Sequence, residues 1–324
     1  MEPLGQLPPV AAHECEAAAG TARRIAENVR SAVQVPARTL EHVLVALVAE
    51  GHVLMEDYPG VGKTALARAL ARSVDCQFAR IQCTADLLPA DVAGTNVYNQ
   101  REGRFEFRPG PVFANVVIVD EVNRASPRTQ SGLLECMQER SVTVDVHTHE
   151  LARPFLVLAT QNPIEYEGTY PLPEAQVDRF MVRVSLGYPE LEHEVAMLAD
   201  HAAGDRVLTL EPVVTAADVL AAQEVAARVR ASQALREYLV RVLTRTREDA
   251  RVELGASPRA GLMLLRAAKA RAMLYGRGHV EPDDVQALAH PVLAHRLVLA
   301  HDALGDGAGA SAVIADALAA VPAL

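Results

Sequence analysis

Short apolar runs alternate with longer stretches of helical periodicity up to about residue 188. Strands that are buried on both faces of a parallel sheet read as near-continuous apolar runs, because helices cover both faces. The runs predict five strands, at residues 52–56, 78–82, 116–120, 155–160 and 181–186. Strands that alternate with helices in this way predict an α/β fold built around a parallel sheet.

Two segments interrupt the alternation of strand and helix. Residues 97–107 and 142–151 both place apolar side chains at every second position around polar centres. This spacing is typical of half-buried antiparallel strands, so each segment predicts a β-hairpin insertion. We expect both hairpins to project from the surface of the domain.

Beyond residue 188 the strand signal stops and the pattern becomes helical almost to the end of the chain. Helix starts are predicted by Thr215 with Asp218, by Ser257 with Pro258 and by Glu281 with Pro282. This pattern predicts a second, all-helical domain. Residues 305–324 are small, apolar and dotted with glycine, so they form either a docked terminal helix or a frayed tail.

The composition suits packed helices and excludes several classes of protein. Half of the 324 residues are hydrophobic, only 4% are aromatic and none is Trp, which favours helices over a β-sandwich. The formal net charge of −10 argues against a nucleic-acid coat or a polybasic membrane binder. No run without charged residues reaches the roughly 18 residues of a membrane span.

The first residues and the cysteines bear on location. Acids and prolines stand where a secretory signal would have basic and then apolar residues, so we expect no export. The four cysteines show neither C-x-x-C spacing nor a histidine partner at zinc-finger distance. Reduced thiols in a cytoplasmic protein are therefore expected.

The segment EDYPGVGKTA, residues 56–65, lies between a predicted strand and a predicted helix. A glycine-rich turn at that place presents successive backbone N–H groups to phosphates at the positive end of the helix. Lys63 would reach the β- and γ-phosphates, and the Thr64 hydroxyl would bind Mg²⁺. The strict G-x-x-x-x-G-K-[ST] pattern has glycine where this chain has Asp57. The alternative is an ordinary strand-to-helix turn with a solvated lysine.

Residues 116–121, VVIVDE, form an apolar strand that ends in two carboxylates. Asp120 would complete the Mg²⁺ shell, and Glu121 would orient and deprotonate the attacking water. An acidic turn after a strand is common, so Asp120 and Glu121 by themselves are a weak signal. They indicate an ATPase because they follow a phosphate loop, in the order that P-loop ATPases use. The predicted Mg²⁺ ligands are Thr64 and Asp120. The predicted nucleotide-binding residues are Pro59, Gly60, Val61, Gly62, Lys63, Thr64, Ala65 and Asp120.

Three further polar residues are candidates for catalysis. Asn162 follows the fourth strand, at the sheet edge where α/β folds bind ligands, although it would also suit the start of a turn. Arg179 precedes the fifth strand and would otherwise be a surface partner of Asp178. Arg259 stands in the first turn of a predicted helix, where the helix dipole disfavours a cation by about 0.3–1 kcal/mol. A nearby phosphate would remove that penalty.

Five stretches together resemble the MoxR family of AAA+ ATPases. They are GHVLMEDYPGVGKT, RIQCTADLLPADVAG, VVIVDEVNRASPRTQSGLLECMQE, LATQNPIEYEGTYPLPEAQVDRF and GASPRAGLMLLRAAKARA. The resemblance spans about residues 38–295, and the fourth stretch is far more specific than a phosphate loop. It implies an AAA+ αβα sandwich with a five-stranded parallel sheet at 38–187, a helical lid domain at 188–324 and a helical segment at 1–37.

The resemblance also implies a role for each candidate residue. Gly60, Gly62, Lys63 and Thr64 are Walker A, Asp120 and Glu121 are Walker B, Asn162 is sensor 1, Arg179 is the arginine finger and Arg259 is sensor 2. The family accepts Asp57 because Pro59 and Gly60 still make the turn. The two hairpins match the helix-2 insert and the pre-sensor-1 hairpin of the family. ATP sites are expected between neighbours in a ring of about six subunits.

These implications predict a Mg²⁺-dependent ATPase that remodels or activates a partner protein in a chaperone-like way. The resemblance suggests partners with von Willebrand factor A domains. Two alternatives stay open: a magnesium-chelatase-like motor subunit, and an ATP-gated scaffold in which binding matters and turnover does not. A helicase is disfavoured by the net charge of −10.

Overall fold

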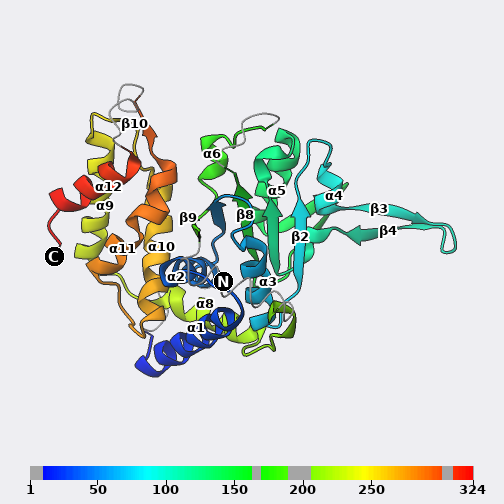
Figure 1. The fold of residues 1–324 in the computed structure, drawn as a ribbon, viewed down its shortest axis with the longest axis horizontal. Coiled ribbons are helices and arrows are strands. Elements are labelled where there is room, and N and C mark those ends of the chain that lie inside the picture. Colours follow the sequence, from blue (N-terminus) through cyan, green and yellow to red (C-terminus); the bar gives the residue numbers. More distant parts are fainter. Residues whose placement is uncertain (1–9, 163–168, 189–205, 301–308, 324) are drawn as a thin grey trace.

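The computed structural model describes residues 10–162, 169–188, 206–300 and 309–323. Its core is a five-stranded parallel sheet in the order β2–β5–β8–β1–β9 (Figure 1). The strands are β1 (Val53–Glu56), β2 (Phe78–Gln82), β5 (Val116–Asp120), β8 (Leu156–Gln161) and β9 (Val182–Val184). All five predicted strands are confirmed, β2 and β5 to the residue, whereas β9 is shorter than the predicted 181–186.

Helices cover both faces of the sheet, so the inner strands β5 and β8 are almost entirely buried, whereas the edge strand β2 carries the exposed polar residues Arg80 and Gln82. Alternate residues along each strand point to opposite faces. Val53 and Ile118 join the core that α3 shares with the N- and C-terminal helices, whereas Leu54 and Val117 join the core under α5. The helices of this part of the chain are α1 (Ala12–Ala32), α2 (Ala37–Val48), α3 (Lys63–Ser73), α4 (Pro89–Ala93), α5 (Pro127–Glu139) and α6 (Glu174–Val177).

Both predicted hairpins are present as antiparallel pairs. They are β3 (Gly94–Asn99) with β4 (Arg104–Pro109), and β6 (Ser141–Val144) with β7 (His147–Glu150). Figure 1 shows the β3–β4 hairpin extending far from the body of the domain. Tyr98 and Phe105 lie next to one another on it with their rings 5.3 Å apart, and both are largely exposed. The hairpin therefore presents an aromatic pair to the solvent.

The C-terminal part of the chain is helical, as predicted, with one exception. Its helices are α8 (Ala216–Arg228), α9 (Gln233–Glu248), α10 (Pro258–Leu274), α11 (Pro282–Leu293) and α12 (Ala310–Ala320). The expectation of an all-helical domain was wrong at β10 (Val252–Leu254) and β11 (Val298–Leu299), which pair antiparallel. These strands are too short and too exposed to leave a periodic pattern. None of the described helices is long and apolar enough to cross a membrane.

Helices begin at all three predicted places, two of them with a side-chain cap, and the last helix is docked. The hydroxyls of Thr215 and Ser257 accept hydrogen bonds from the backbone N–H groups of Asp218 and Ala260. Of the two possibilities for the end of the chain, the described residues 309–323 show the docked helix, α12, with Val313, Ile314 and Ala317 buried. Residues 301–308 lie outside the described part of the chain.

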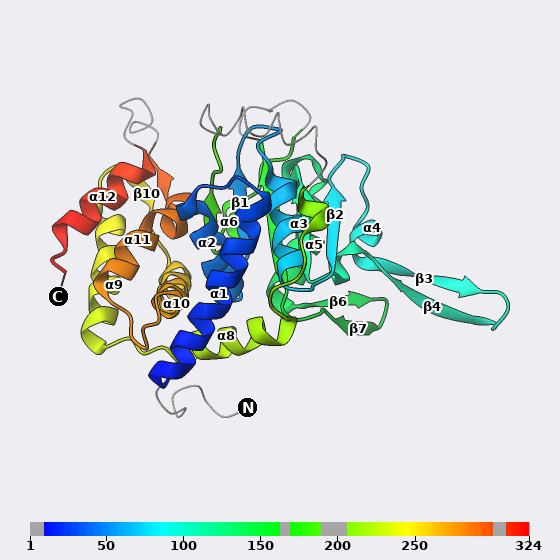
Figure 2. The same cartoon turned by 60° about the horizontal axis from the view of Figure 1, so that its bottom comes forward.

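Helix α1 joins the sheet layer to the C-terminal helices (Figure 2). Asn28 of α1 donates a hydrogen bond of 3.0 Å to the Ser73 hydroxyl at the end of α3. Glu14, near the other end of α1, accepts hydrogen bonds of 2.9 and 3.1 Å from the Arg228 guanidinium of α8. Contacts at both ends of one long helix therefore tie these two layers together.

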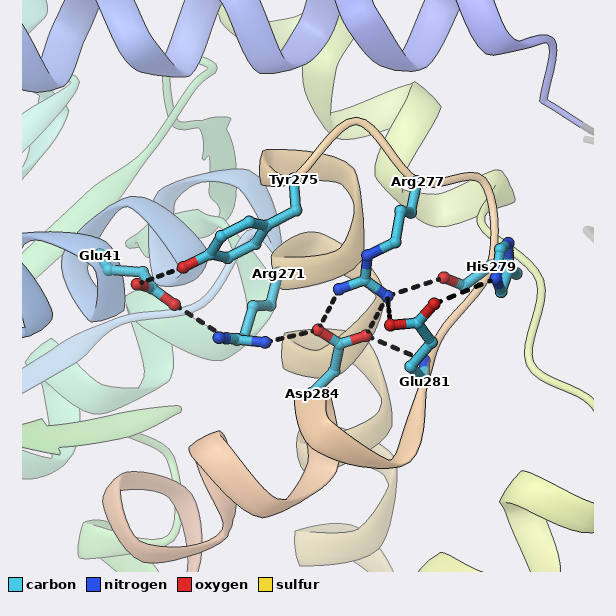
Figure 3. A network of polar contacts seen from close by, with 7 residues as sticks. All are labelled: Glu41, Arg271, Tyr275, Arg277, His279, Glu281 and Asp284. Atoms are coloured by element: carbon cyan, nitrogen blue, oxygen red, sulfur yellow. Dashed lines mark hydrogen bonds and ion pairs between the residues drawn. The ribbon is translucent and has the colours of Figure 1, made fainter. Parts of the chain in front are cut away.

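A buried polar network makes a second connection between the two layers (Figure 3). The Asp284 carboxylate of α11 is fully buried and accepts 2.7 Å hydrogen bonds from Arg271 and Arg277. Arg271 also donates to Glu41 of α2 at 2.8 Å, and Glu41 accepts a further hydrogen bond from the Tyr275 hydroxyl. A buried carboxylate is tolerated only when it is paired and hydrogen-bonded, so this cluster fixes α2 against α10 and α11.

Candidate nucleotide-binding and catalytic site

A cavity of about 350 Å³ lies where β1, β5 and β8 end, at the carboxyl edge of the sheet. This is the edge at which parallel α/β folds bind ligands. The cavity is lined by Asp57, Pro59, Gly60, Gly62, Lys63, Thr64, Ala65, Arg80, Asp120, Glu121, Thr160 and Asn162. Nine of the residues predicted to bind nucleotide or to catalyse therefore meet at one place. Val61 sits in the same loop with its side chain buried in the core.

The loop between β1 and α3 has the backbone geometry of a phosphate cradle. Gly60 and Gly62 have φ values of +86° and +90°, in the left-handed region that strongly favours glycine. Gly62 is the N-cap of α3, and no side chain caps this helix end. The first N–H groups of α3 therefore face the cavity without a capping partner, which makes the helix start a binding place for an anion.

Lys63 is held across the loop. Its Nζ donates hydrogen bonds to the carbonyl oxygens of Asp57 at 2.8 Å and Tyr58 at 3.2 Å. Burial lowers the pKa of Lys63, and the nearby carboxylates of Asp57, Asp120 and Glu121 act in the opposite direction. A half-buried ammonium group in a cavity with free helix N–H groups fits a phosphate chain well.

Asp57 stands where the strict pattern has glycine, and its carboxylate connects the phosphate loop to residues 185–187. The side chain accepts hydrogen bonds from the Ser185 hydroxyl at 2.6 Å and from the backbone N–H groups of Leu186 at 2.6 Å and Gly187 at 3.0 Å. The residue is only 4% exposed and its φ is not positive, so the backbone does not need glycine there. Asp57 therefore fastens the phosphate loop to the chain that follows β9.

Asp120 and Thr64 line the same cavity and provide oxygen donors for Mg²⁺. Mg²⁺ is commonly held by one or two carboxylates together with water and substrate phosphates, so one carboxylate and one hydroxyl fit it. Asp120 accepts a hydrogen bond from the Arg80 Nε at 2.7 Å and one from the Thr160 hydroxyl at 3.4 Å. These two contacts fix the orientation of the carboxylate.

Glu121 has a strained backbone. Its φ of 57° and ψ of 50° lie in the left-handed region, which costs a non-glycine residue about 1–2 kcal/mol. The Glu121 N–H donates to the Thr160 hydroxyl at 2.9 Å, and its carboxylate contacts Arg124 at 3.0 Å and Gln82 at 3.2 Å. These contacts therefore stabilise Glu121 in its strained conformation. Its carboxylate lines the cavity, where it could contact a water that attacks a phosphate.

Arg179 and Arg259 do not line this cavity. Arg179 is half-buried beyond α6 and, within the described part of the chain, has no ion-pair partner. The alternative pairing with Asp178 does not form, since Asp178 binds Arg296 at 2.6 Å and Arg259 at 3.5 Å. The anion beside the first turn of α10 is therefore Asp178 in this single chain. The predicted roles of both arginines need a neighbouring subunit or a different lid position.

Three residues of the site escaped the sequence analysis: Thr160, Arg80 and Gln82. Arg80 and Gln82 gave no usable signal, because polar side chains are ordinary at the exposed positions of an edge strand. Thr160 gave none either, because a threonine at the end of an apolar strand is ordinary. Thr160 matters because β8 lies next to β5, which brings its hydroxyl into contact with both Walker B residues, Asp120 and Glu121.

Comparisons with known proteins agree with the geometry. Residues 52–182 match the model of the ATPase family associated with various cellular activities (AAA), and residues 244–317 match the AAA lid domain. The chain is 50% identical to the uncharacterized protein YeaC of Bacillus subtilis, over 86% of this chain and 87% of that protein. It is 42% identical to the chaperone MoxR1 of Mycobacterium tuberculosis, over 94% of this chain and 82% of that protein.

A solved structure has a closely similar fold. The crystal structure of a protein from Cytophaga hutchinsonii, described as a candidate ATPase, superimposes with a TM-score of 0.90 at 37% identity and covers 96% of this chain and 97% of its own. A phosphate cradle, a strained glutamate beside a Mg²⁺-compatible aspartate and a helical lid occur together here. With relatives this similar over most of their length, the chain belongs to the MoxR family of AAA+ ATPases.

Proposed function

We propose that the protein hydrolyses ATP with Mg²⁺ as part of a cytoplasmic ring of about six subunits. Turnover would remodel or activate a partner protein complex, in the manner of a chaperone. The observation that carries the hydrolytic activity is that Lys63, Thr64, Asp120 and Glu121 line one cavity at the edge of the sheet. We also propose the domain limits predicted above, with a nucleotide domain at 38–187 and a lid domain at 188–324.

Each residue would have a distinct part in the reaction. The free N–H groups of α3 and Lys63 would hold the phosphates, and Thr64 and Asp120 would hold Mg²⁺, which screens the charge of the phosphates when bound. Glu121 would accept the proton of the attacking water. Asn162, at the end of β8, would orient that water through its amide.

A ring is supported by the position of Arg179. The residue lies outside the cavity of its own subunit, and no described carboxylate neutralises it. An arginine finger supplied by a neighbour stabilises charge in the transition state. Arg179 would act in this way on the adjacent ATP site.

The experiment compares Lys63→Ala with Glu121→Gln. Lys63 binds phosphate in the ground state, so its loss should abolish nucleotide binding, whereas Glu121→Gln should bind ATP normally and lose turnover. Fluorescent-nucleotide titration and phosphate release measure the two effects separately. Equal nucleotide affinity in the wild type and Lys63→Ala would contradict the assignment. Partner activation that survives in Glu121→Gln would favour the ATP-gated scaffold.

The partner class is proposed from the family. One relative is named a chaperone, and family resemblance points to proteins with von Willebrand factor A domains. The projecting β3–β4 hairpin, with Tyr98 and Phe105 exposed, offers a surface on which a protein client would bind. The proposed partner class is tested by purifying the Glu121→Gln variant in the presence of ATP and asking whether a protein with a von Willebrand factor A domain co-purifies with it.

A further inference from the structure

We propose that Asp178 and Arg296 form a clamp that positions Arg179 and links it to the lid of the same subunit. This inference rests on the proposed role of Arg179 in the neighbouring ATP site. Asp178 and Arg296 would be positioning residues, since their effect on the reaction passes through Arg179.

Arg296 contacts the chain on both sides of Arg179. It follows α11 in a short turn, and its side chain is only 3% exposed. Its Nε donates to the Asp178 carboxylate at 2.6 Å, and its terminal nitrogens donate to the carbonyl oxygens of Asp178 at 3.0 Å, Phe180 at 2.6 Å and Met181 at 3.3 Å. One planar guanidinium therefore fixes the backbone before and after Arg179, which the three donors of a lysine ammonium would not match.

Asp178 is shared between two cations of the helical region. One carboxylate oxygen binds Arg296, and the other lies 3.5 Å from the Nε of Arg259 at the start of α10. The Arg259 side chain is 46% exposed, so its contact is screened by solvent and weaker than that of buried Arg296. The carboxylate nearest to Arg179 in sequence is thus already occupied.

This arrangement leaves Arg179 available. One carboxylate faces two arginines, so the cluster has one positive charge in excess. Arg179 would gain little by turning back toward it, because like charges repel. Asp178 and Arg296 also line one side of a cavity of about 1070 Å³ between α6 and the β10–β11 pair.

The clamp would couple two ATP sites. The helical region contains both Arg259, which as the expected sensor 2 would contact the nucleotide of its own subunit, and Arg296, which holds the turn of Arg179. If Arg259 moves from Asp178 to a phosphate, Asp178 keeps only Arg296 as its partner. The nucleotide state of one subunit would then alter the position of the arginine that serves its neighbour.

The test uses Asp178→Asn and Arg296→Lys in the full chain. An arginine finger contributes about 10³–10⁵ in rate, and a displacement of about 1 Å in a catalytic group costs about 10²-fold. We expect both variants to lower kcat about 100-fold while the Kd for a fluorescent ATP analogue stays within about threefold, because the phosphate loop is untouched.

Mixed rings distinguish positioning from a merely structural role. Lys63→Ala subunits have an intact Arg179 and an intact clamp, so adding them to Asp178→Asn subunits should restore turnover at the mixed interfaces. Arg179→Ala mixed with Lys63→Ala is the reference and should recover in the same way. A variant whose lid or assembly is merely damaged would bind ATP poorly and would not be rescued.

Asp284→Asn is the matched control. Asp284 is also a carboxylate of the helical region that binds two arginines, and its network reaches Glu41 of α2 and leaves Arg179 untouched (Figure 3). We expect Asp284→Asn to lower thermal stability without a defect that Lys63→Ala subunits rescue. Since Asp178 is 22% exposed and Asp284 is fully buried, Asp178→Asn should fold even if Arg296→Lys does not.

Two results would overturn the clamp. One is turnover by Asp178→Asn within about threefold of the wild type. The other is an Asp178→Asn defect that Lys63→Ala subunits do not rescue, in a series where Arg179→Ala is rescued; the proposed finger would then stand and the clamp alone would fail. If Arg179→Ala is not rescued either, the proposed action of Arg179 on a neighbour is wrong, and the clamp falls with it.

Discussion

Replacing Asp57 with glycine would restore the strict phosphate-loop pattern, yet we expect it to weaken the protein. The Asp57 carboxylate is buried and accepts three hydrogen bonds, two of them from backbone N–H groups after β9. The φ of Asp57 is not positive, so glycine brings no relief of strain. It adds only freedom to the unfolded chain, which costs about 0.5–1 kcal/mol.

The size of the effect follows from these contacts. Hydrogen bonds to a charged group contribute about 1.5–3 kcal/mol each, and their sum is smaller than three separate losses because water can enter. A loss of about 3–5 kcal/mol is therefore expected, which is a large part of a typical stability of about 5–15 kcal/mol. At roughly 2–4 °C per kcal/mol, Tm should fall by roughly 6–20 °C.

The loop should also bind ATP less well, because a loop that is no longer fastened must be ordered by the ligand. We expect a Kd raised about tenfold, as 1.4 kcal/mol of ordering cost would give. Thermal unfolding and fluorescent-nucleotide titration measure the two effects. Asp57→Asn keeps the side-chain volume and one acceptor, so it should fall between the wild type and Asp57→Gly.

Asp283→Asn is the surface control, since Asp283 is exposed in the first turn of α11. It should change Tm by no more than about 4 °C, as a dipole contact of about 0.3–1 kcal/mol implies. Asp57→Gly with the Tm and the ATP affinity of the wild type would refute the reasoning. In that case the three hydrogen bonds would contribute nothing that water does not replace.

Three further predictions concern other parts of the molecule. Thr160→Val removes the hydroxyl that contacts both Asp120 and Glu121, so single-turnover hydrolysis should slow about 10–100-fold with ATP binding unchanged; an unaltered rate would count against this contact. Burial lowers the pKa of both His42 and His52 to about 4, so the unfolded chain takes up protons first as pH falls below about 6.5. Stability should be full above that pH and fall by about 2 kcal/mol per histidine by about pH 5, and urea unfolding that is independent of pH would contradict this. Phe105→Ser on the β3–β4 hairpin should leave basal ATPase activity intact and weaken stimulation by a protein client, whereas loss of basal activity would place the hairpin in the catalytic machinery.

Local order in the sequence was enough to predict the sheet and the phosphate loop. Short apolar runs between helical stretches located β2 and β5 to the residue, although of these two only β5 is buried on both faces. The turn at Gly60 and Gly62 depends only on glycine and on a few neighbouring residues, so it can be predicted from the local sequence. The caps at Thr215 and Ser257 are equally local.

Tertiary structure alone decided how the charged and strained residues are used. Asp178 and Arg179 are adjacent in sequence, yet Asp178 pairs with Arg296, more than a hundred residues further along the chain. The left-handed conformation of Glu121 is held by Thr160 from a neighbouring strand, and no local pattern announces it. The physical reason is that backbone propensities and apolar periodicity act between near neighbours in sequence, whereas an ion pair or a buried hydrogen bond forms with whichever partner the packed elements bring within about 3 Å.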